Sequence, residues 1–167
     1  MTDKKLKIQD ASTDALRPYA DLADGTGKTP AADSAMFSFW NDLSVGDVSG
    51  APVSFGMVKT KPGELTAPMV ERHLKTTETL VPLDEDIILV LAKPSSGDSP
   101  DLDTLAAFRV QQGTAITLKK GTWHYIPLIA GKKQGRTLVV FRQGTPDDDL
   151  QVYDVLKNHG VRVILQK

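Results

Sequence analysis

Short apolar runs, separated by polar residues, glycines and prolines, recur along most of this chain. Each run is only a few residues long, and many alternate branched or aromatic side chains with polar ones, as strands do. The pattern predicts strands over 51–59, 68–73, 79–82, 87–92, 105–110, 115–118 and 137–142. Many short strands with turn residues between them favour a mainly β fold, a sandwich or barrel with a few short peripheral helices.

The segment before these strands is less regular. Residues 5–8 can form a first strand, and Ser12 or Thr13 can cap a helix that Pro18 keeps short. Residues 24–34, rich in glycine, threonine, proline and alanine, are typical of an open loop.

A helix is predicted after the last long strand. The three aspartates at 147–149 favour a helix start, because negative charge stabilises the N-terminus of a helix. Gly160 would end this helix, and 161–165 would form a last strand. Its apolar side would consist of Leu150, Val152, Val155 and Leu156.

Length and charge limit the class of protein. With 167 residues, the chain fits one domain over 1–167, with a core at about 50–143 and with 1–49 and 144–167 packing on it as extensions. A formal net charge of -1 gives no basic excess, so we expect no nucleic-acid partner. No apolar run approaches the length of a membrane span and no secretory signal is recognisable, so we expect no membrane partner and a cytoplasmic location. The chain has no cysteine, which excludes disulfides and thiolate ligands.

Only three histidines occur in the chain, and one belongs to the motif Glu71-x-His73-x4-Glu78. In an extended strand, Glu71 and His73 lie on one face because side chains alternate with a period of two. A bulge or bend would bring Glu78 to the same place.

A second histidine follows a turn glycine in the motif Gly113-x5-Lys119-x-Gly121-x2-His124. Gly121 permits a sharp reversal that lifts His124 off the strand end. Two imidazoles and two carboxylates would form a mixed nitrogen and oxygen site that suits manganese, iron, nickel, cobalt or zinc better than calcium or magnesium.

Together the two motifs resemble the two-part signature of the cupin superfamily, which reads His-x-His-x4-Glu and then Gly-x5-Pro-x-Gly-x2-His. Glu71 takes the place of the first histidine and Lys119 that of the proline. The resemblance implies a cupin-type double-stranded β-helix, that is, a jelly-roll barrel.

The blocks Glu71-Arg72-His73 and Gly121-Thr122-Trp123-His124, with Pro127-Leu128 after them, are similar to the ureidoglycolate lyase family, also called ureidoglycolate hydrolase. The similarity extends from about Leu6 to about Val155. The chain departs from the family pattern at three positions: Glu78 stands where glutamine is frequent, Tyr125 follows the Trp-His pair, and Phe141 replaces an acid.

This resemblance implies an enzyme that cleaves (S)-ureidoglycolate to glyoxylate and urea in allantoin and purine nitrogen catabolism. It also implies a homodimer, a small-molecule substrate, a divalent transition metal and no organic cofactor. The catalytic residues would be Glu71, His73 and His124, and the metal ligands His73, Glu78 and His124, with Glu71 as a fourth ligand or as the base. Candidates for substrate binding are Lys119, Lys120, Trp123 and Arg142.

Other interpretations remain open. The lysines beside a turn are often merely solvated, and Trp123 fits a core as well as a pocket wall. The aspartates at 147–149 are interpreted as a solvated helix start and His159 as a surface residue, so both are left out of the site. A diverged cupin isomerase or oxygenase, or a non-catalytic cupin that binds a small molecule, is the alternative function.

Overall fold

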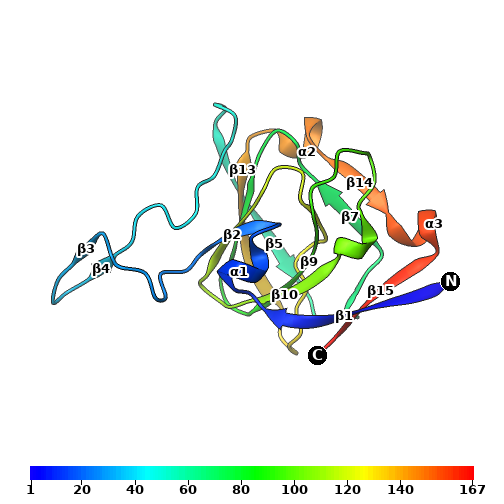
Figure 1. Ribbon diagram of the computed structural model, residues 1–167, viewed down its shortest axis with the longest axis horizontal. Coiled ribbons are helices and arrows are strands. Elements are labelled where there is room, and N and C mark those ends of the chain that lie inside the picture. The colour runs from blue at the N-terminus through cyan, green and yellow to red at the C-terminus, as the bar shows by residue number, and fades with distance from the viewer.

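Two curled β-sheets that share a core make up most of the molecule (Figure 1). The structure is a computed structural model that describes residues 1–167. The larger sheet has eight strands in the order β14-β7-β12-β9-β10-β1-β15-β6. Their bounds are β1 Thr2–Asp10, β6 Thr66–Ala67, β7 Met69–Arg72, β9 Ile87–Ala92, β10 Ala106–Val110, β12 Trp123–His124, β14 Gln151–Asp154 and β15 Val161–Gln166.

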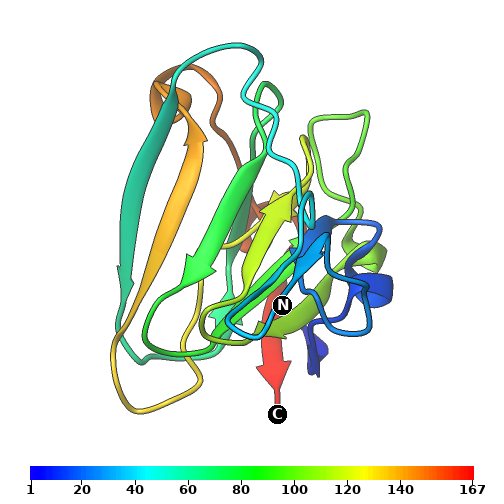
Figure 2. The ribbon, with the colours of Figure 1, turned by 90° about the vertical axis from the view of Figure 1, so that its left-hand side faces the viewer.

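The second sheet has five strands in the order β2-β11-β8-β13-β5. Figure 2 shows it with β5, in blue-green, and β13, in orange, side by side at one edge. These strands are β2 Ala20–Ala23, β5 Val53–Thr60, β8 Glu78–Pro82, β11 Ala115–Leu118 and β13 Gly135–Arg142. A small hairpin of β3 (Ala32–Asp33) and β4 (Ser38–Phe39) projects from the body (Figure 1). Strand β3 lies inside the segment 24–34 predicted as an open loop, and β4 lies just after it.

The larger sheet curls until its two ends meet. Strand β6 pairs with β15 at one end of the sheet, whereas β7 pairs with β12 and β14 at the other. Only Pro68 separates β6 from β7, so one continuous segment joins both ends. Proline lacks a backbone N–H, which explains why the ladder is interrupted there.

Strand β9 lies at the centre of the larger sheet and is buried on both faces. Ile87, Leu89 and Leu91 face the core between the two sheets, whereas Ile88, Val90 and Ala92 face a second cluster inside the curl of the larger sheet. The alternation follows from the period of two along a strand. A run that is apolar at every position therefore serves two cores at once.

The mainly β architecture with short peripheral helices is confirmed. The helices are α1 Thr13–Leu16, α2 Thr145–Asp148 and α3 Val155–His159, with a 3₁₀ turn η1 at Leu102–Thr104. Ser12 caps α1, since its hydroxyl accepts a hydrogen bond from the backbone N–H of Ala15 at 3.3 Å. No helix of the structure is long and apolar enough to cross a membrane.

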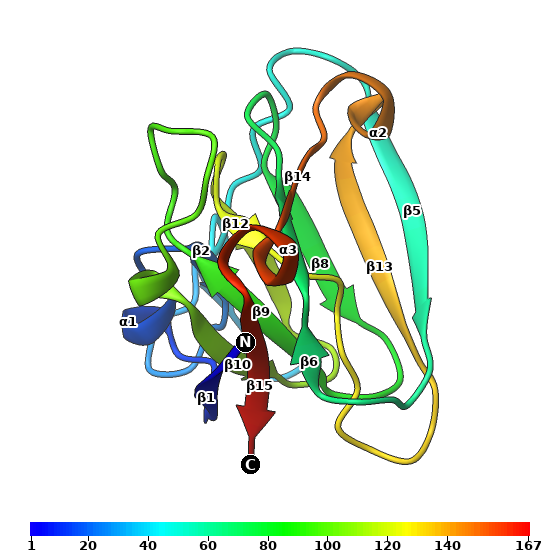
Figure 3. The same cartoon turned by 90° about the vertical axis from the view of Figure 1, so that its right-hand side faces the viewer.

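The single helix predicted after Gly144 is wrong. The segment forms two short helices, α2 and α3, with the strand β14 between them (Figure 3). Strand β14 pairs with β7 along its whole length. Sheet pairing has overridden the local helix signal, as tertiary context often does. The outward side chains of this strand include the exposed Val152.

Both terminal segments contribute strands to the larger sheet. Strand β1 lies between β10 and β15 and runs parallel to both. This pairing supports the prediction of one domain over 1–167, which stays a prediction.

Candidate metal centre

Strand pairing brings the two sequence motifs together. His124, in the two-residue strand β12, lies opposite Glu71 of β7 on one side and opposite Leu91 of β9 on the other. The backbone N–H of Gly121 donates a hydrogen bond to the carbonyl of His73 at 2.6 Å. Gly121 has φ +80°, which confirms the predicted reversal of the chain before the histidine.

Four side chains converge at this junction. The Nε2 atom of His124 lies 2.9 Å from Glu78 Oε2 and 3.6 Å from Glu71 Oε1. His73 Nε2 lies 3.8 Å from Glu78 Oε2, and the two imidazole rings are 5.3 Å apart between centroids. One ligand atom each of Glu71, His73 and His124 lies within 4.8 Å of the other two, close enough to hold a single ion.

The outer nitrogen of each imidazole is engaged by the backbone. His73 Nδ1 lies 2.6 Å from the carbonyl oxygen of Asp149, and His124 Nδ1 lies 3.1 Å from that of Thr122. A carbonyl can only accept, so each Nδ1 carries the proton and donates it. With that proton on Nδ1, Nε2 is the ring nitrogen that can offer a lone pair to an ion at the centre of the cluster, as in metal-ligating histidines.

Two buried atoms of this cluster have no hydrogen-bond partner, although they are near each other. They are His124 Nε2 and Glu78 Oε2, whose orientation does not make a hydrogen bond across their 2.9 Å separation. A buried polar atom without a partner is costly, and a cation between these two atoms would satisfy both. The residues therefore fit a divalent transition metal.

Without a metal, a proton takes the place of the cation. Burial opposes the charged form of His124, but attraction to Glu78 and Glu71 outweighs it and raises the pKa of His124 to about 10. Burial likewise opposes ionisation of Glu78, yet the neighbouring His124 and His73 hold the pKa of Glu78 below its usual value. The cluster is therefore built to stabilise one positive charge.

A cavity of about 320 Å³ opens onto these side chains. Glu71, His73 and Glu78 line it together with apolar residues of β5, β13, α2 and the segment after α2, which are Met57, Val58, Val139, Phe141, Pro146 and Leu150. Phe141 lies edge-on to the His73 ring at 6.1 Å between centroids. The cavity thus places the charged cluster against a mainly apolar wall.

The cations predicted to bind substrate are paired elsewhere. Lys119 Nζ donates to the carbonyl of Arg17 at 2.5 Å, and Lys120 Nζ lies 2.5 Å from Asp47 Oδ2. Arg142 pairs with Asp148. No lysine or arginine lines the cavity.

Trp123, the remaining predicted substrate contact, lies in the second core cluster and is 1% exposed. Its indole N–H donates to Ser95 Oγ at 3.0 Å, and the Arg72 guanidinium lies 4.4 Å from the ring centroid. The side chain of Arg72 therefore packs away from Glu71 and His73, as the strand period predicts. Trp123 does not line the cavity.

Sequence reasoning missed Asp149. The sequence pattern predicts a solvated helix start for Asp149 and the two aspartates before it, but Asp149 is 6% exposed and its carboxylate accepts hydrogen bonds from the backbone N–H groups of Leu74 and Lys75. The one available signal is its position directly before the apolar Leu150. That signal does not distinguish a buried aspartate from its two exposed neighbours.

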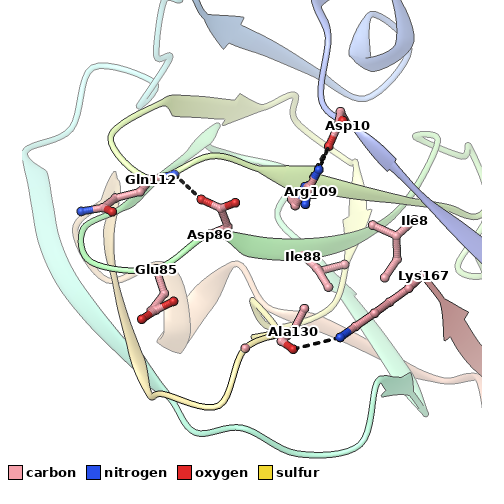
Figure 4. Close-up of a pocket in the computed structure, with 10 residues that line it drawn as sticks. Ile8, Asp10, Glu85, Asp86, Ile88, Arg109, Gln112, Ala130 and Lys167 are labelled. Carbon is pink, nitrogen blue, oxygen red and sulfur yellow. Dashed lines mark hydrogen bonds and ion pairs between the residues drawn. The ribbon is translucent and has the colours of Figure 1, made fainter.

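A larger cavity of about 570 Å³ lies elsewhere, and Figure 4 shows the side chains that line it. Arg109 pairs there with Asp10 at 2.6 Å, and Asp86 accepts a hydrogen bond from the backbone N–H of Gln112 at 2.9 Å. It opens near Asp86, before the start of β9, whereas His124 lies opposite Leu91 near the end of that strand. No histidine lines it, so it is separate from the metal centre.

Comparison with known proteins agrees with the motifs. Residues 3–162 match the family model described as ureidoglycolate lyase. The ureidoglycolate lyase of Saccharomyces cerevisiae is 32% identical over 95 residues, which cover 54% of this chain and 49% of the yeast protein. The chain thus spans about half the length of that relative. The ureidoglycolate lyase of Pseudomonas syringae pv. tomato is 26% identical over 147 residues, which cover 85% of each protein.

Among solved structures, oxalate decarboxylase from Bacillus subtilis aligns with this chain at a TM-score of 0.44 and 17% identity. The alignment covers 63% of this chain and 24% of the decarboxylase chain. Because the family model covers nearly the whole sequence, and the two motifs that carry the resemblance meet in one cluster, this chain belongs to the ureidoglycolate lyase family.

Proposed function

We propose that this chain is a metal-assisted ureidoglycolate lyase, which splits ureidoglycolate into glyoxylate and urea. The observation that carries the proposal is the convergence of two Nε2 lone pairs and two carboxylates beside a mainly apolar cavity, in a chain of this family. The substrate has one carbon that bears a hydroxyl, a carboxylate and the ureido nitrogen. Its cleavage needs a base for the hydroxyl proton and a proton for the departing nitrogen.

The ligands we propose are His73, His124 and Glu78, and of the two roles open to Glu71, fourth ligand or base, we propose the base. A divalent manganese, nickel, iron or zinc ion bound there would be coordinated by the carboxylate and hydroxyl oxygens of the substrate and would lower the pKa of that hydroxyl. Since no cationic side chain lines the cavity, we expect binding of the substrate carboxylate to require this ion.

Glu71 is the best placed proton carrier. Its side chain is 32% exposed and lines the cavity, whereas the Glu78 side chain is only 9% exposed and lies against both imidazoles. Glu71 Oε1 would take the proton of the substrate hydroxyl as the C–O bond becomes a carbonyl and the C–N bond breaks. The same oxygen would return the proton to the ureido nitrogen, so the products are neutral urea and glyoxylate and no other reactant is consumed.

The apolar wall would hold the substrate and limit access of water. Val58, Val139 and Leu150 offer no hydrogen bond to a competing water molecule, so the polar end of the substrate is directed to the imidazole and carboxylate cluster. A cytoplasmic location and a homodimeric assembly stay predictions of the sequence.

A coupled assay for urea and glyoxylate tests the proposal. Purified protein is treated with chelator, then assayed on ureidoglycolate with and without Mn²⁺ or Ni²⁺. We expect metal-dependent release of equal amounts of both products. His124→Ala should lower kcat/KM by at least about 100-fold, because it removes a ligand.

His159→Ala is the matched control, since His159 is exposed and bonds only with the Tyr153 hydroxyl at 2.8 Å. Equal urea release by wild type and His124→Ala would exclude the proposed centre. Release of neither product by the metal-loaded wild type would exclude the activity itself.

A further inference from the structure

Asp149 joins the segment after α2 to the turn that follows His73. Its carboxylate oxygens accept one hydrogen bond each, Oδ1 from the backbone N–H of Leu74 and Oδ2 from that of Lys75, both at 2.8 Å. Asp149 is 6% exposed, so these bonds form away from most of the solvent. Hydrogen bonds to a charged group in such a place are stronger than neutral ones.

The same residue contacts the imidazole through its backbone. His73 Nδ1 donates to the carbonyl oxygen of Asp149 at 2.6 Å, while the backbone N–H of Asp149 donates to the carbonyl of Thr145 at 3.0 Å. Asp149 thus fixes the turn after His73 with its side chain and the ring of His73 with its carbonyl. Neither contact involves the substrate cavity, which Asp149 does not line.

We propose that Asp149 is a positioning residue, which holds His73 in the tautomer and orientation that present Nε2 to the cluster. The alternative tautomer would place a proton on Nε2, and Glu78 Oε2 at 3.8 Å is available to attract it. The Asp149 carbonyl prevents this by requiring a proton on Nδ1. The carboxylate keeps that carbonyl in place, because it attaches the same residue to the next two backbone N–H groups of the His73 turn.

Asp149 also connects this turn to the cavity wall. Leu150 follows it directly, and Pro146 lies in α2 before it; both line the cavity. Displacement of Asp149 would therefore move His73 and one wall of the cavity together. This inference depends on the proposed function only in giving His73 a role as ligand.

The first test is the tautomer of His73 in metal-free protein, read from long-range ¹H–¹⁵N correlations of the imidazole at about pH 8.5, where an ordinary histidine is neutral. Wild type should show a single tautomer with the proton on Nδ1. Asp149→Ala should show a mixture of tautomers, and Asp149→Asn, which keeps the volume and one acceptor, should be intermediate. Asp147→Ala is the matched control from the same run, since Asp147 is exposed.

The second test is binding of Mn²⁺ measured by calorimetry. We expect about 10-fold weaker binding for Asp149→Ala and a smaller loss for Asp149→Asn. Loss of a residue that hydrogen-bonds to a metal-ligating histidine typically lowers metal affinity by about this factor. Asp147→Ala should bind as wild type does. A residue with only a structural role would lower the melting temperature without changing the tautomer.

Wild-type tautomer and wild-type Mn²⁺ affinity in a folded Asp149→Ala would overturn the proposal. If that variant does not fold, the same result in Asp149→Asn overturns it, and so does a wild-type His73 that carries its proton on Nε2. The tautomer measurement contains neither substrate nor metal. A shifted tautomer in a protein without ureidoglycolate activity would therefore leave this inference standing and reject only the proposed function.

Discussion

Replacement of Glu78 by glutamine tests the electrostatics of the cluster most directly. Glu78 lies 2.9 Å from His124 Nε2 and 3.8 Å from His73 Nε2, and both partners are buried. In metal-free protein, the variant leaves His124 with only the partly exposed Glu71 as a charged neighbour, at 3.6 Å. We expect a loss of stability and a change in its dependence on pH.

The magnitude follows from the shift of the pKa of His124. A rise from 6.5 to about 10 corresponds to at most roughly 5 kcal/mol, at about 1.4 kcal/mol for each pH unit. Removal of one partner from a buried ion pair costs about 3–5 kcal/mol. We therefore expect Glu78→Gln to destabilise the metal-free protein by about 3 kcal/mol, a fall in Tm of about 10 °C for a chain of this length.

The sign of the pH dependence is specific. Because the pKa of His124 is raised, its contribution to stability is complete below pH 6.5 and is lost as the pH rises towards about 10. Because the pKa of Glu78 is lowered, its contribution is present above its ordinary value of 4.5 and is lost in acid. Wild-type stability from this pair should therefore be highest between these two ordinary pKa values and should decline in alkali.

Thermal denaturation in the presence of a chelator, over a series of pH values, measures both effects. Glu78→Gln should lose the alkaline decline that wild type shows, because burial then dominates and lowers the pKa of His124. Glu64→Gln is a control on an exposed glutamate. An unchanged Tm in Glu78→Gln, or an alkaline decline equal to that of wild type, would refute the assignment of a buried charged pair.

Two further changes separate chemistry from packing. Glu71→Gln should lower kcat by about 100- to 10,000-fold in metal-loaded protein, because the variant lacks the proton carrier. Its Tm should change little, since the Glu71 side chain is partly exposed. A wild-type kcat in the coupled assay would exclude Glu71 as the base. Trp123→Phe should lower stability by about 1–2 kcal/mol, because it removes the hydrogen bond to Ser95 and weakens the contact with Arg72, yet should leave KM for ureidoglycolate unchanged. A large rise in KM without loss of stability would place Trp123 in the substrate site instead.

Much of the strand framework was predictable because its signal is local. The runs predicted at 87–92 and 115–118 are β9 and β11 with the same bounds, and the turn at Gly121 has the positive φ that its glycine indicated. In each case the determining factor lies within a few residues: an apolar run bounded by turn residues, or the conformational freedom of one glycine.

The four candidate ligands were also predictable as a group, and the structure brings them together. Their spacing in two motifs carried that prediction, although strands β9 and β10 lie between the motifs along the chain. The supporting residue Asp149 could not be found in the same way, because its bonds to Leu74 and Lys75 join positions 75 and 74 residues apart. A long-range hydrogen bond leaves no periodic trace in the sequence.

The sequence by itself determined the β class, the turn at Gly121 and the imidazoles and carboxylates that are candidates for a metal site, since each depends on local pattern or on residue type. Only the tertiary structure decided that 151–154 is a strand and not part of a helix, that the curled sheet closes through Pro68, and that Lys119 and Lys120 pair away from the cavity. The physical reason is common to all three. Sheet pairing and the contacts of long side chains depend on partners that are distant along the chain. The free energy of these contacts overrides weak local preferences.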